Sequence, residues 1–142
     1  NSIYFSNNKN EFYSVDIKSG TINWTNRVNS SLTPIIVNDY IFTISDRGYF
    51  FTIQKKKGNI IRVKDIYKNI KLKKRKNIKP TGFLIGQNKI YLSNSNGTLF
   101  VIDLSSGNLL KTEKVSRDLI SRPYINNGDL FIVKNGSVIQ YD

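Results

Sequence analysis

Residues 90–110, IYLSNSNGTLFVIDLSSGNLL, contain three short apolar runs separated by two turns that end in glycine. The first turn ends in Asn96-Gly97 and the second in Ser106-Gly107. Such dipeptides supply the positive φ angles that a tight hairpin requires. The stretch therefore predicts three short antiparallel strands joined by hairpins.

The same pattern recurs along the chain at intervals of about 40 residues. Its leading apolar strand starts at Ile3, Ile41, Ile90 and Leu130. A fourth short strand is expected at residues 34–37, 82–85 and 123–125, each beginning near a proline or a glycine. Four short strands per repeat are typical of a β-propeller blade. We therefore expect an all-β chain built of four-stranded antiparallel blades, with about three and a half blades present and no helix.

The expected blades span about residues 1–37, 38–85 and 86–125, with a half blade at 126–142, in a single partial propeller domain over 1–142. Residues 64–79 form a basic insertion. A partial ring leaves blade faces and sheet edges unpaired. Either more blades lie outside this stretch, which is the favoured alternative, or two copies close a ring together.

Residues that recur at equivalent positions are expected to be structural. An Asp can bond backbone amides within its turn, and Gly adopts the left-handed conformation at little cost. A catalytic group should occur once, so the repeated Asp, including Asp142, indicates turn architecture. The structural repeat positions are Asp16, Gly20, Trp24, Gly48, Gly58, Gly97, Asp103, Gly107 and Gly136.

The composition narrows the possible chemistry. Cysteine and histidine are both absent, so thiolate ligands, disulfides and imidazole bases are excluded within this stretch. The turns at 46–48 and 94–97 offer oxygen atoms, but the full acidic calcium loop is missing. We therefore predict no catalytic, cofactor-binding or metal-binding residue, no cofactor and no enzymatic activity.

The formal net charge is +12, and residues 55–79 hold twelve of the 22 Lys and Arg residues. Apolar residues interleave with the charges between 66 and 78, which predicts that part of the insertion extends a strand. The insertion is either a solvated loop or a contact for an anionic membrane surface, an acidic protein or nucleic acid. Nucleic acid is the least favoured partner, because only Tyr67 offers a ring for base stacking. The candidate contact residues are Lys68, Lys71, Lys73, Lys74, Arg75 and Lys76.

These repeats resemble the pyrroloquinoline-quinone-type β-propeller family. Residues 90–110 follow its repeat, and Trp24 lies where that repeat has its blade tryptophan. The matching positions in later repeats carry Arg62 and Lys111, and Gln54 replaces the turn aspartate. Docking between blades through stacked tryptophans is therefore expected to be weakened.

Within that family, the small repeats look most like the propeller lipoprotein that serves outer-membrane β-barrel assembly. The resemblance implies a non-catalytic periplasmic scaffold at the outer membrane, whose partner is a protein of the barrel-assembly machinery. It implies no small-molecule substrate and allows self-association through open blade edges. The alternative is a fragment of a quinone-dependent oxidoreductase whose cofactor ligands lie outside this stretch.

Overall fold

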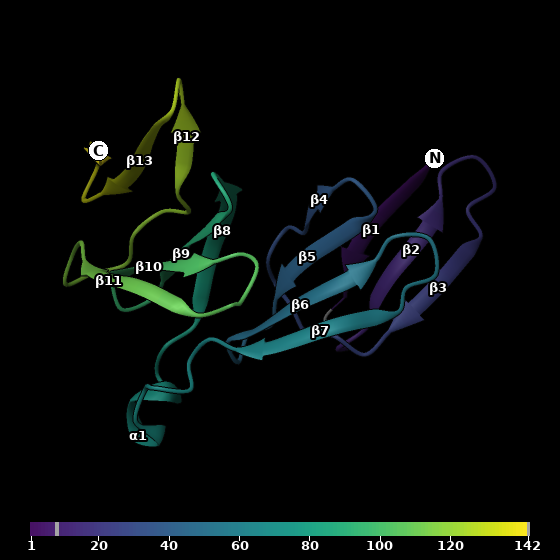
Figure 1. The fold of residues 1–142 in the computed structure, drawn as a ribbon, viewed down its shortest axis with the longest axis horizontal. Coiled ribbons are helices and arrows are strands. Elements are labelled where there is room, and N and C mark those ends of the chain that lie inside the picture. The colour runs from purple at the N-terminus through teal and green to yellow at the C-terminus, as the bar shows by residue number, and fades with distance from the viewer. Residues whose placement is uncertain (8, 142) are drawn as a thin grey trace. The chain divides into compact units, whose positions relative to one another are not determined.

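The computed structural model describes residues 1–7 and 9–141 (Figure 1). Their strands form four sheets, and every strand pair is antiparallel. The all-β prediction is confirmed. The chain divides into two compact units, Asn1–Asp65 and Ile66–Asp142, and each is described separately. That they form one partial domain stays a prediction.

The first unit contains two sheets. The first sheet has the order β1 (Ser2–Ser6), β2 (Phe12–Asp16), β3 (Ile22–Asn26). The second sheet has the order β4 (Ile35–Val37), β5 (Tyr40–Ile44), β6 (Tyr49–Gln54), β7 (Ile60–Asp65).

The second unit begins with the basic segment, which contains α1 (Leu72–Arg75), and continues into two further sheets. One sheet has the order β8 (Pro80–Gly86), β9 (Lys89–Asn94), β10 (Thr98–Asp103), β11 (Leu109–Lys114). The other has the order β12 (Tyr124–Asn126), β13 (Asp129–Lys134), β14 (Ser137–Tyr141). No helix in the described part of the chain has the length and apolar character needed to cross a membrane.

The expected blade boundaries are wrong by one strand. The segments expected to end the blades at 34–37, 82–85 and 123–125 instead pair with the strand that follows each of them. The physical reason is a two-residue hairpin loop, at 38–39, 87–88 and 127–128, each with at least one residue at positive φ. The sheets therefore group residues 35–65 and 80–114 as complete four-stranded blades, flanked by three-stranded sheets at 2–26 and 124–141.

A β-bulge recurs at one position of the repeat. The pairing register shifts between Ser14 and Val15 in β2, between Thr52 and Ile53 in β6, and between Val101 and Ile102 in β10. Each shift comes just before the glycine turn that leads to the outer strand. A bulge increases local twist, so the outer strands of the three sheets depart from their neighbours in the same way.

Each unit has an apolar core of its own. In the first unit, fully buried Phe12 of β2 packs with Val28, Ile41 and Ile53, and Trp24 packs against this cluster. In the second unit the cluster of buried residues comes from β8, β10, β13 and the 114–123 connection: Leu84, Leu99, Val115, Ile120, Leu130 and Ile132. These clusters join neighbouring sheets within a unit.

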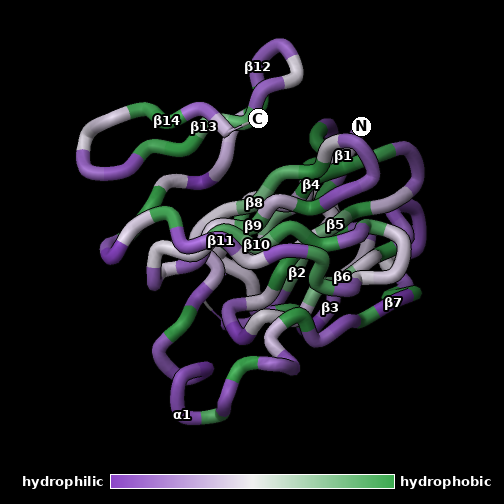
Figure 2. Tube along the Cα trace, turned by 60° about the vertical axis from the view of Figure 1, so that its left-hand side comes forward, coloured by the Kyte–Doolittle hydropathy of each residue, from purple (hydrophilic) through white to green (hydrophobic). Residues whose placement is uncertain are grey.

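The basic insertion differs from its expectation in two ways. Its first two residues, Lys64 and Asp65, belong to β7, and no strand continues beyond them until Pro80. Residues 72–75 form a single helical turn where no helix was expected. Like charges on successive residues disfavour a flat edge strand, and Leu72 finds no sheet face to cover. We call residues 66–79 the basic lobe; in Figure 2 the tube around α1 is mostly hydrophilic, with short apolar interruptions.

Candidate partner- and anion-binding surface

The basic lobe begins at a buried tyrosine. Tyr67 is fully buried, its ring meets Phe100 edge-on at 5.9 Å between centroids, and its hydroxyl donates a hydrogen bond to Asn94 Oδ1. Burial raises the pKa of Tyr67 well above its usual value, against the opposing charge of Arg75. The hydroxyl therefore remains a donor, and the start of the lobe is fixed to the end of β9.

The lobe ends at the same hairpin. The Lys79 N–H donates to Ser95 Oγ at 2.9 Å, and the Ser95 N–H donates to the Lys79 carbonyl oxygen at 2.8 Å. Since Asn94 and Ser95 are neighbours, both ends of the lobe are attached to one turn, between β9 and β10. The lobe is a closed loop on a fixed base, and in Figure 1 it projects away from the β8–β11 sheet.

The turn that carries the lobe packs closely against residues 115–118. Gly97 has φ +75°, and a Cβ at this position would lie 2.4 Å from the backbone oxygens of both Ser116 and Asp118. The Gly97 carbonyl oxygen accepts hydrogen bonds from the Val115 and Ser116 N–H groups at 3.0 and 3.1 Å. Only glycine fits this position without moving the backbone.

The same turn carries the oxygen atoms of an incomplete calcium loop. Its amide oxygens serve protein donors: Asn94 Oδ1 accepts from Tyr67, and Asn96 Oδ1 accepts from Thr98 Oγ1 at 2.7 Å. In residues 1–7 and 9–141, no three His, Cys, Asp or Glu side chains come close enough to hold a metal ion. The amide oxygen atoms of Asn94 and Asn96 therefore accept hydrogen bonds that stabilise the turn.

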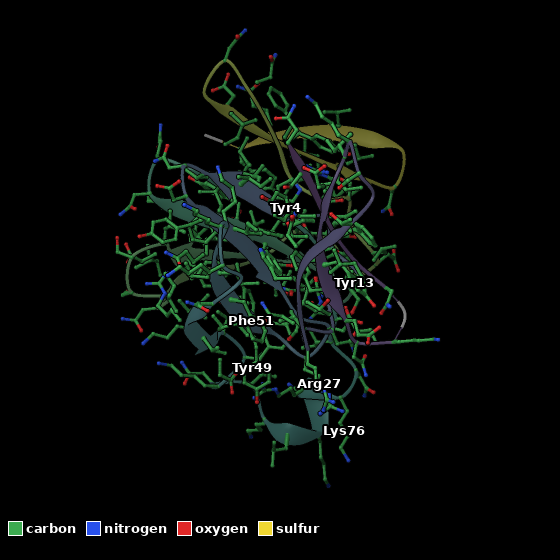
Figure 3. The ribbon with its side chains drawn as sticks, turned by 90° about the vertical axis from the view of Figure 1, so that its right-hand side faces the viewer. Tyr4, Tyr13, Arg27, Tyr49, Phe51 and Lys76 are labelled. Atoms are coloured by element: carbon green, nitrogen blue, oxygen red, sulfur yellow. The ribbon has the colours of Figure 1, made fainter. Side chains whose placement is uncertain are left out.

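The outer part of the lobe is exposed. Its helical turn closes with the Lys74 and Arg75 N–H groups donating to the Lys71 carbonyl oxygen, both at 2.9 Å, and none of its residues is buried. Leu72 is 77% exposed. Figure 3 labels Lys76, the residue that follows the helical turn.

The structure places all six candidate contact residues on this lobe, where no acidic residue lies between 66 and 79. Arg75 is half-buried near Tyr67, and the five lysines are exposed. Among the residues that the structure describes, the ammonium groups of these lysines make no hydrogen bond or ion pair with the protein. The five lysines are Lys68, Lys71, Lys73, Lys74 and Lys76.

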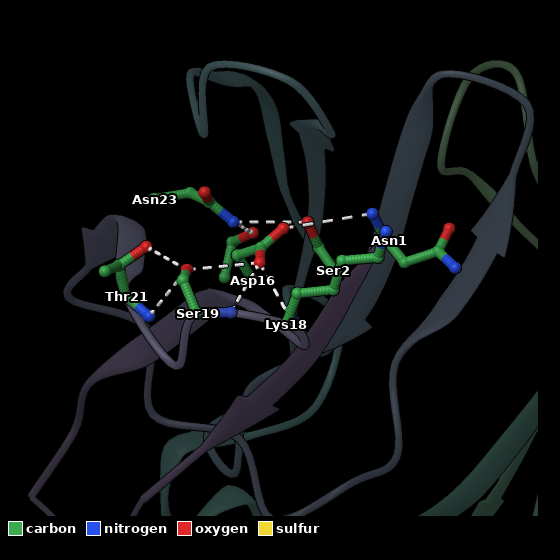
Figure 4. A network of polar contacts seen from close by, with 8 residues as sticks. Asn1, Ser2, Asp16, Lys18, Ser19, Thr21 and Asn23 are labelled. Atoms are coloured by element: carbon green, nitrogen blue, oxygen red, sulfur yellow. Dashed lines mark hydrogen bonds and ion pairs between the residues drawn. The ribbon is translucent and has the colours of Figure 1, made fainter.

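The structural repeat positions lie in turns or at the strand ends that lead into them, except Trp24, which lies in β3. Asp16 Oδ1 accepts hydrogen bonds from the N–H groups of Lys18 and Ser19 at 2.9 and 3.0 Å (Figure 4). The Ser19 N–H, followed by the Ser19 hydroxyl, lowers the pKa of the Asp16 carboxyl. Asp103 Oδ1 accepts in the same way from Ser106, at 2.7 Å from both its N–H and its hydroxyl. Asp142 lies outside the described residues. The glycines at repeat positions all have positive φ: Gly20, Gly48, Gly58, Gly97, Gly107 and Gly136.

Trp24 joins the two sheets of the first unit. Its Nε1–H donates to the Lys55 carbonyl oxygen at 3.0 Å, and its ring covers Gly58, with Cδ2 only 2.5 Å from an ideal Cβ position. At the equivalent positions, the Arg62 guanidinium lies over the Phe50 ring of its own sheet, and Lys111 pairs with Glu113 at 3.0 Å. Docking of one sheet on the next through an indole ring is thus seen at Trp24, and Arg62 and Lys111 make different contacts.

Sequence reasoning placed the cations together but did not identify the base of the lobe. The relevant signal was the Asn94-Ser95 pair at the end of a buried strand. Its two side chains can accept hydrogen bonds from the two ends of an inserted loop. Leu72 is one of the apolar residues that interleave with the charges, and the structure exposes its side chain in α1, where no strand forms.

Residues 1–64 match the family model described as outer membrane protein assembly factor BamB. No curated protein matches the chain. BamB from Moraxella catarrhalis has a similar structure, with 14% identity, a TM-score of 0.71, and coverage of 99% of this chain and 42% of that chain.

Two other solved structures illustrate how widely the fold occurs. The computationally designed Ika4 protein has 12% identity and a TM-score of 0.73, over 99% of this chain and 84% of that chain. A quinohemoprotein alcohol dehydrogenase from Pseudomonas putida HK5 has 20% identity and a TM-score of 0.61, over 80% of this chain and 19% of that chain.

At these identities the structural matches establish the fold alone. The chain spans less than half the length of the BamB chain that it matches. The prediction of a partial β-propeller is confirmed, and so is the resemblance to the quinone-type repeat. Residues 1–64 thus resemble the BamB family model, and the chain as a whole has the fold of a PQQ-type β-propeller.

Proposed function

We propose that this chain is part of a non-catalytic, protein-binding propeller that acts as a periplasmic scaffold at the outer membrane and assists the assembly of β-barrel proteins. The observation that supports the proposal is the match of residues 1–64 to the BamB model. The structural similarity to BamB over 99% of the chain adds a compatible fold. Its partner is a protein component of the barrel-assembly machinery.

The outer strand β7 offers one binding mode for this scaffold. It is the last strand of its sheet, and Ile61 and Val63 on it are 54% and 47% exposed. An extended segment of a partner can add to such an edge by main-chain hydrogen bonds, with side-chain contacts giving specificity. The equivalent strand β11 exposes a single large apolar residue, Leu110, beside Lys111 and Lys114, so β7 is the more apolar edge.

The basic lobe offers a second contact, through its cations. In the proposed scaffold these lysines orient the propeller on its partner and accelerate association, because charge complementarity acts mainly on the rate of encounter. The residues assigned to this contact are Lys68, Lys71, Lys73, Lys74, Arg75 and Lys76.

The test is a pull-down of the complete protein from solubilised cell envelope. It compares the unaltered protein with a variant in which Lys71, Lys73, Lys74 and Lys76 are changed to Glu. A matched control changes four exposed lysines of the first unit to Glu, and both variants lower the formal net charge from +12 to +4. The control lysines are Lys9, Lys18, Lys56 and Lys57.

We expect the unaltered protein to recover barrel-assembly components and the control to do so equally. Selective loss in the lobe variant assigns the orienting contact to the lobe, whereas retention assigns it elsewhere on the propeller. Recovery of no barrel-assembly component by the unaltered protein refutes the proposed function.

A quinone-dependent oxidoreductase is the second candidate, because a quinohemoprotein alcohol dehydrogenase shares the fold over 80% of this chain. The two candidates differ in a simple assay. The complete oxidoreductase binds a redox-active quinone and reduces an artificial electron acceptor when an alcohol is supplied, whereas the scaffold does neither.

A further inference from the structure

The exposed lysines of the basic lobe carry charge that no ion pair within the described residues neutralises. Seven Lys or Arg residues occur in the fourteen positions 66–79, with no Asp or Glu among them. The five exposed lysines make no ion pair within the described part of the chain. An array of this density attracts a surface that carries many negative charges.

The lobe also exposes an apolar side chain at its centre. Leu72 lies between Lys71 and Lys73, is 77% exposed, and is the first residue of α1. An exposed leucine with a lysine on each side in sequence suits an interface in which apolar and charged layers adjoin. Lysine side chains can place their ammonium groups among phosphates while their methylene stems and the leucine reach the acyl boundary.

The base of the lobe holds this tip in a defined place. Tyr67 and Lys79 attach both ends of the loop to the β9–β10 turn, and the Gly97 carbonyl oxygen accepts hydrogen bonds from Val115 and Ser116. The cations and Leu72 are therefore presented together on a fixed projection of the second unit, and not on an unattached tail.

The chemistry of the lobe favours lipid over the other polyanions. Its only aromatic ring, Tyr67, is fully buried, so no ring is available to stack on nucleic acid bases. All the exposed cations are lysines, which act as point charges, whereas bidentate recognition of carboxylates is the property of arginine. A surface of diffuse phosphate charge matches this composition.

We infer that the basic lobe docks the protein onto an anionic phospholipid surface, with its lysines at the headgroup phosphates and Leu72 at the acyl boundary. This membrane contact does not depend on the proposed scaffold function. It adds a lipid-binding site to a chain that has no membrane-spanning helix in its described residues.

The first experiment measures co-sedimentation of the complete protein with vesicles of phosphatidylcholine alone, or with about 30% phosphatidylglycerol added. Each lysine near an anionic surface contributes roughly a fivefold gain in binding. Changing Lys71, Lys73, Lys74 and Lys76 to Ala should therefore weaken binding to the anionic vesicles several hundredfold, by order of magnitude. The matched control changes Lys9, Lys18, Lys56 and Lys57 to Ala and should leave most of the binding in place. Circular dichroism verifies that each variant is folded.

The second experiment tests the position of Leu72. The chain has no cysteine, so Leu72→Cys creates a unique attachment point for an environment-sensitive fluorophore. We expect a blue shift and a gain in emission on anionic vesicles, and no change on neutral ones. The control is Leu119→Cys, which labels a leucine that is 62% exposed on the 114–123 connection of the same unit. Leu72→Asp should lower vesicle binding roughly tenfold, because one buried leucine is lost.

Several results overturn the inference. Equal binding to neutral and anionic vesicles removes the charge contribution, and equal losses in the lobe variant and its control remove the assignment to the lobe. No fluorophore response at position 72 refutes insertion of the tip. A last measurement compares how well polyuridylate, polyglutamate and soluble anionic lipid displace the protein from vesicles. If either polymer displaces it at a lower concentration of charge than the lipid does, the partner is instead nucleic acid or an acidic protein, respectively.

Discussion

Gly58→Ala is the substitution for which the structure gives the sharpest expectation. The glycine has φ +74°, and an added Cβ would lie 2.5, 2.7 and 2.8 Å from three ring carbons of Trp24. Trp24 is held in place by its hydrogen bond to the Lys55 carbonyl oxygen. The ring therefore cannot move away from a new methyl group without loss of that bond or of its packing on Phe12.

Two costs add up at Gly58. A non-glycine residue in the left-handed region costs about 1–2 kcal/mol, and relief of the overlap with the ring costs about 1–3 kcal/mol more. Gly20 provides the matched control, because it has φ +70° and nothing within 4 Å of an added Cβ. Gly20→Ala should therefore cost only the backbone term, leaving an excess of about 2 kcal/mol for Gly58→Ala.

The assay is urea denaturation of the complete protein, followed by far-ultraviolet circular dichroism. Each glycine variant is also made in a Trp24→Leu background. In that background the excess cost at Gly58 should vanish, which is a coupling energy of about 2 kcal/mol in the double-mutant cycle. If Gly58→Ala is no more destabilising than Gly20→Ala, or if the excess persists without the indole, docking of the first sheet by Trp24 on Gly58 is refuted.

Three further substitutions probe the base of the lobe, at Tyr67 and Gly97, and the repeat turn at Asp16. Tyr67→Phe leaves Asn94 Oδ1 without its donor, so we expect a cost of about 1–2 kcal/mol and faster trypsin cleavage within 68–76; unchanged cleavage would mean that this bond does not fix the lobe. Gly97→Ala should cost about 3 kcal/mol or more, because two backbone oxygens must move; a thermal midpoint equal to that of the unaltered protein would contradict this. The pKa of Asp16 is lowered in the folded state, so its contribution to stability is present above the unfolded pKa and is lost as the pH falls through the folded pKa. Asp16→Asn should therefore reduce the acid-side fall in the urea midpoint between about pH 5 and 3, and an unaltered pH dependence would contradict the assignment.

Strand positions followed from the sequence because each strand is bounded by turns that have their own chemistry. The Asp-to-Gly turn of residues 16–20 and the Asn-Gly turn at 96–97 specify local geometry, and local geometry can be read from short segments. The sheet to which each strand belongs was harder to predict. Residues 34–37, for example, have a predicted strand before them and another after them, and could pair with either. The two-residue loop at 38–39, with Asn38 at φ 52°, decides the pairing with β5. A two-residue loop of this kind between two apolar segments is itself a signal for a hairpin.

The candidate surface shows a different limit. The cations of the lobe are evident in any reading of residues 66–79, because charge is additive and needs no structure. Its fixed base depends on Tyr67 reaching Asn94, 27 positions away in sequence, and on Lys79 reaching Ser95. Contacts of that range depend on how the strands between them pack, which no local pattern specifies. Leu72 is likewise exposed because no sheet lies beside it in the described structure, and its own sequence neighbours do not predict this.

Attachment of the lobe at Tyr67 and Lys79 has a consequence for protein engineering. Because both ends of the lobe meet at one turn, the distance between them is set by the base and not by the number of residues in between. The entropic cost of a longer loop rises only slowly with its length, by about 0.6 kcal/mol for each doubling. Residues 68–78 are therefore a permissive insertion site, where an epitope, a lanthanide tag or a second binding peptide can replace the native segment while the sheets on either side keep their pairing.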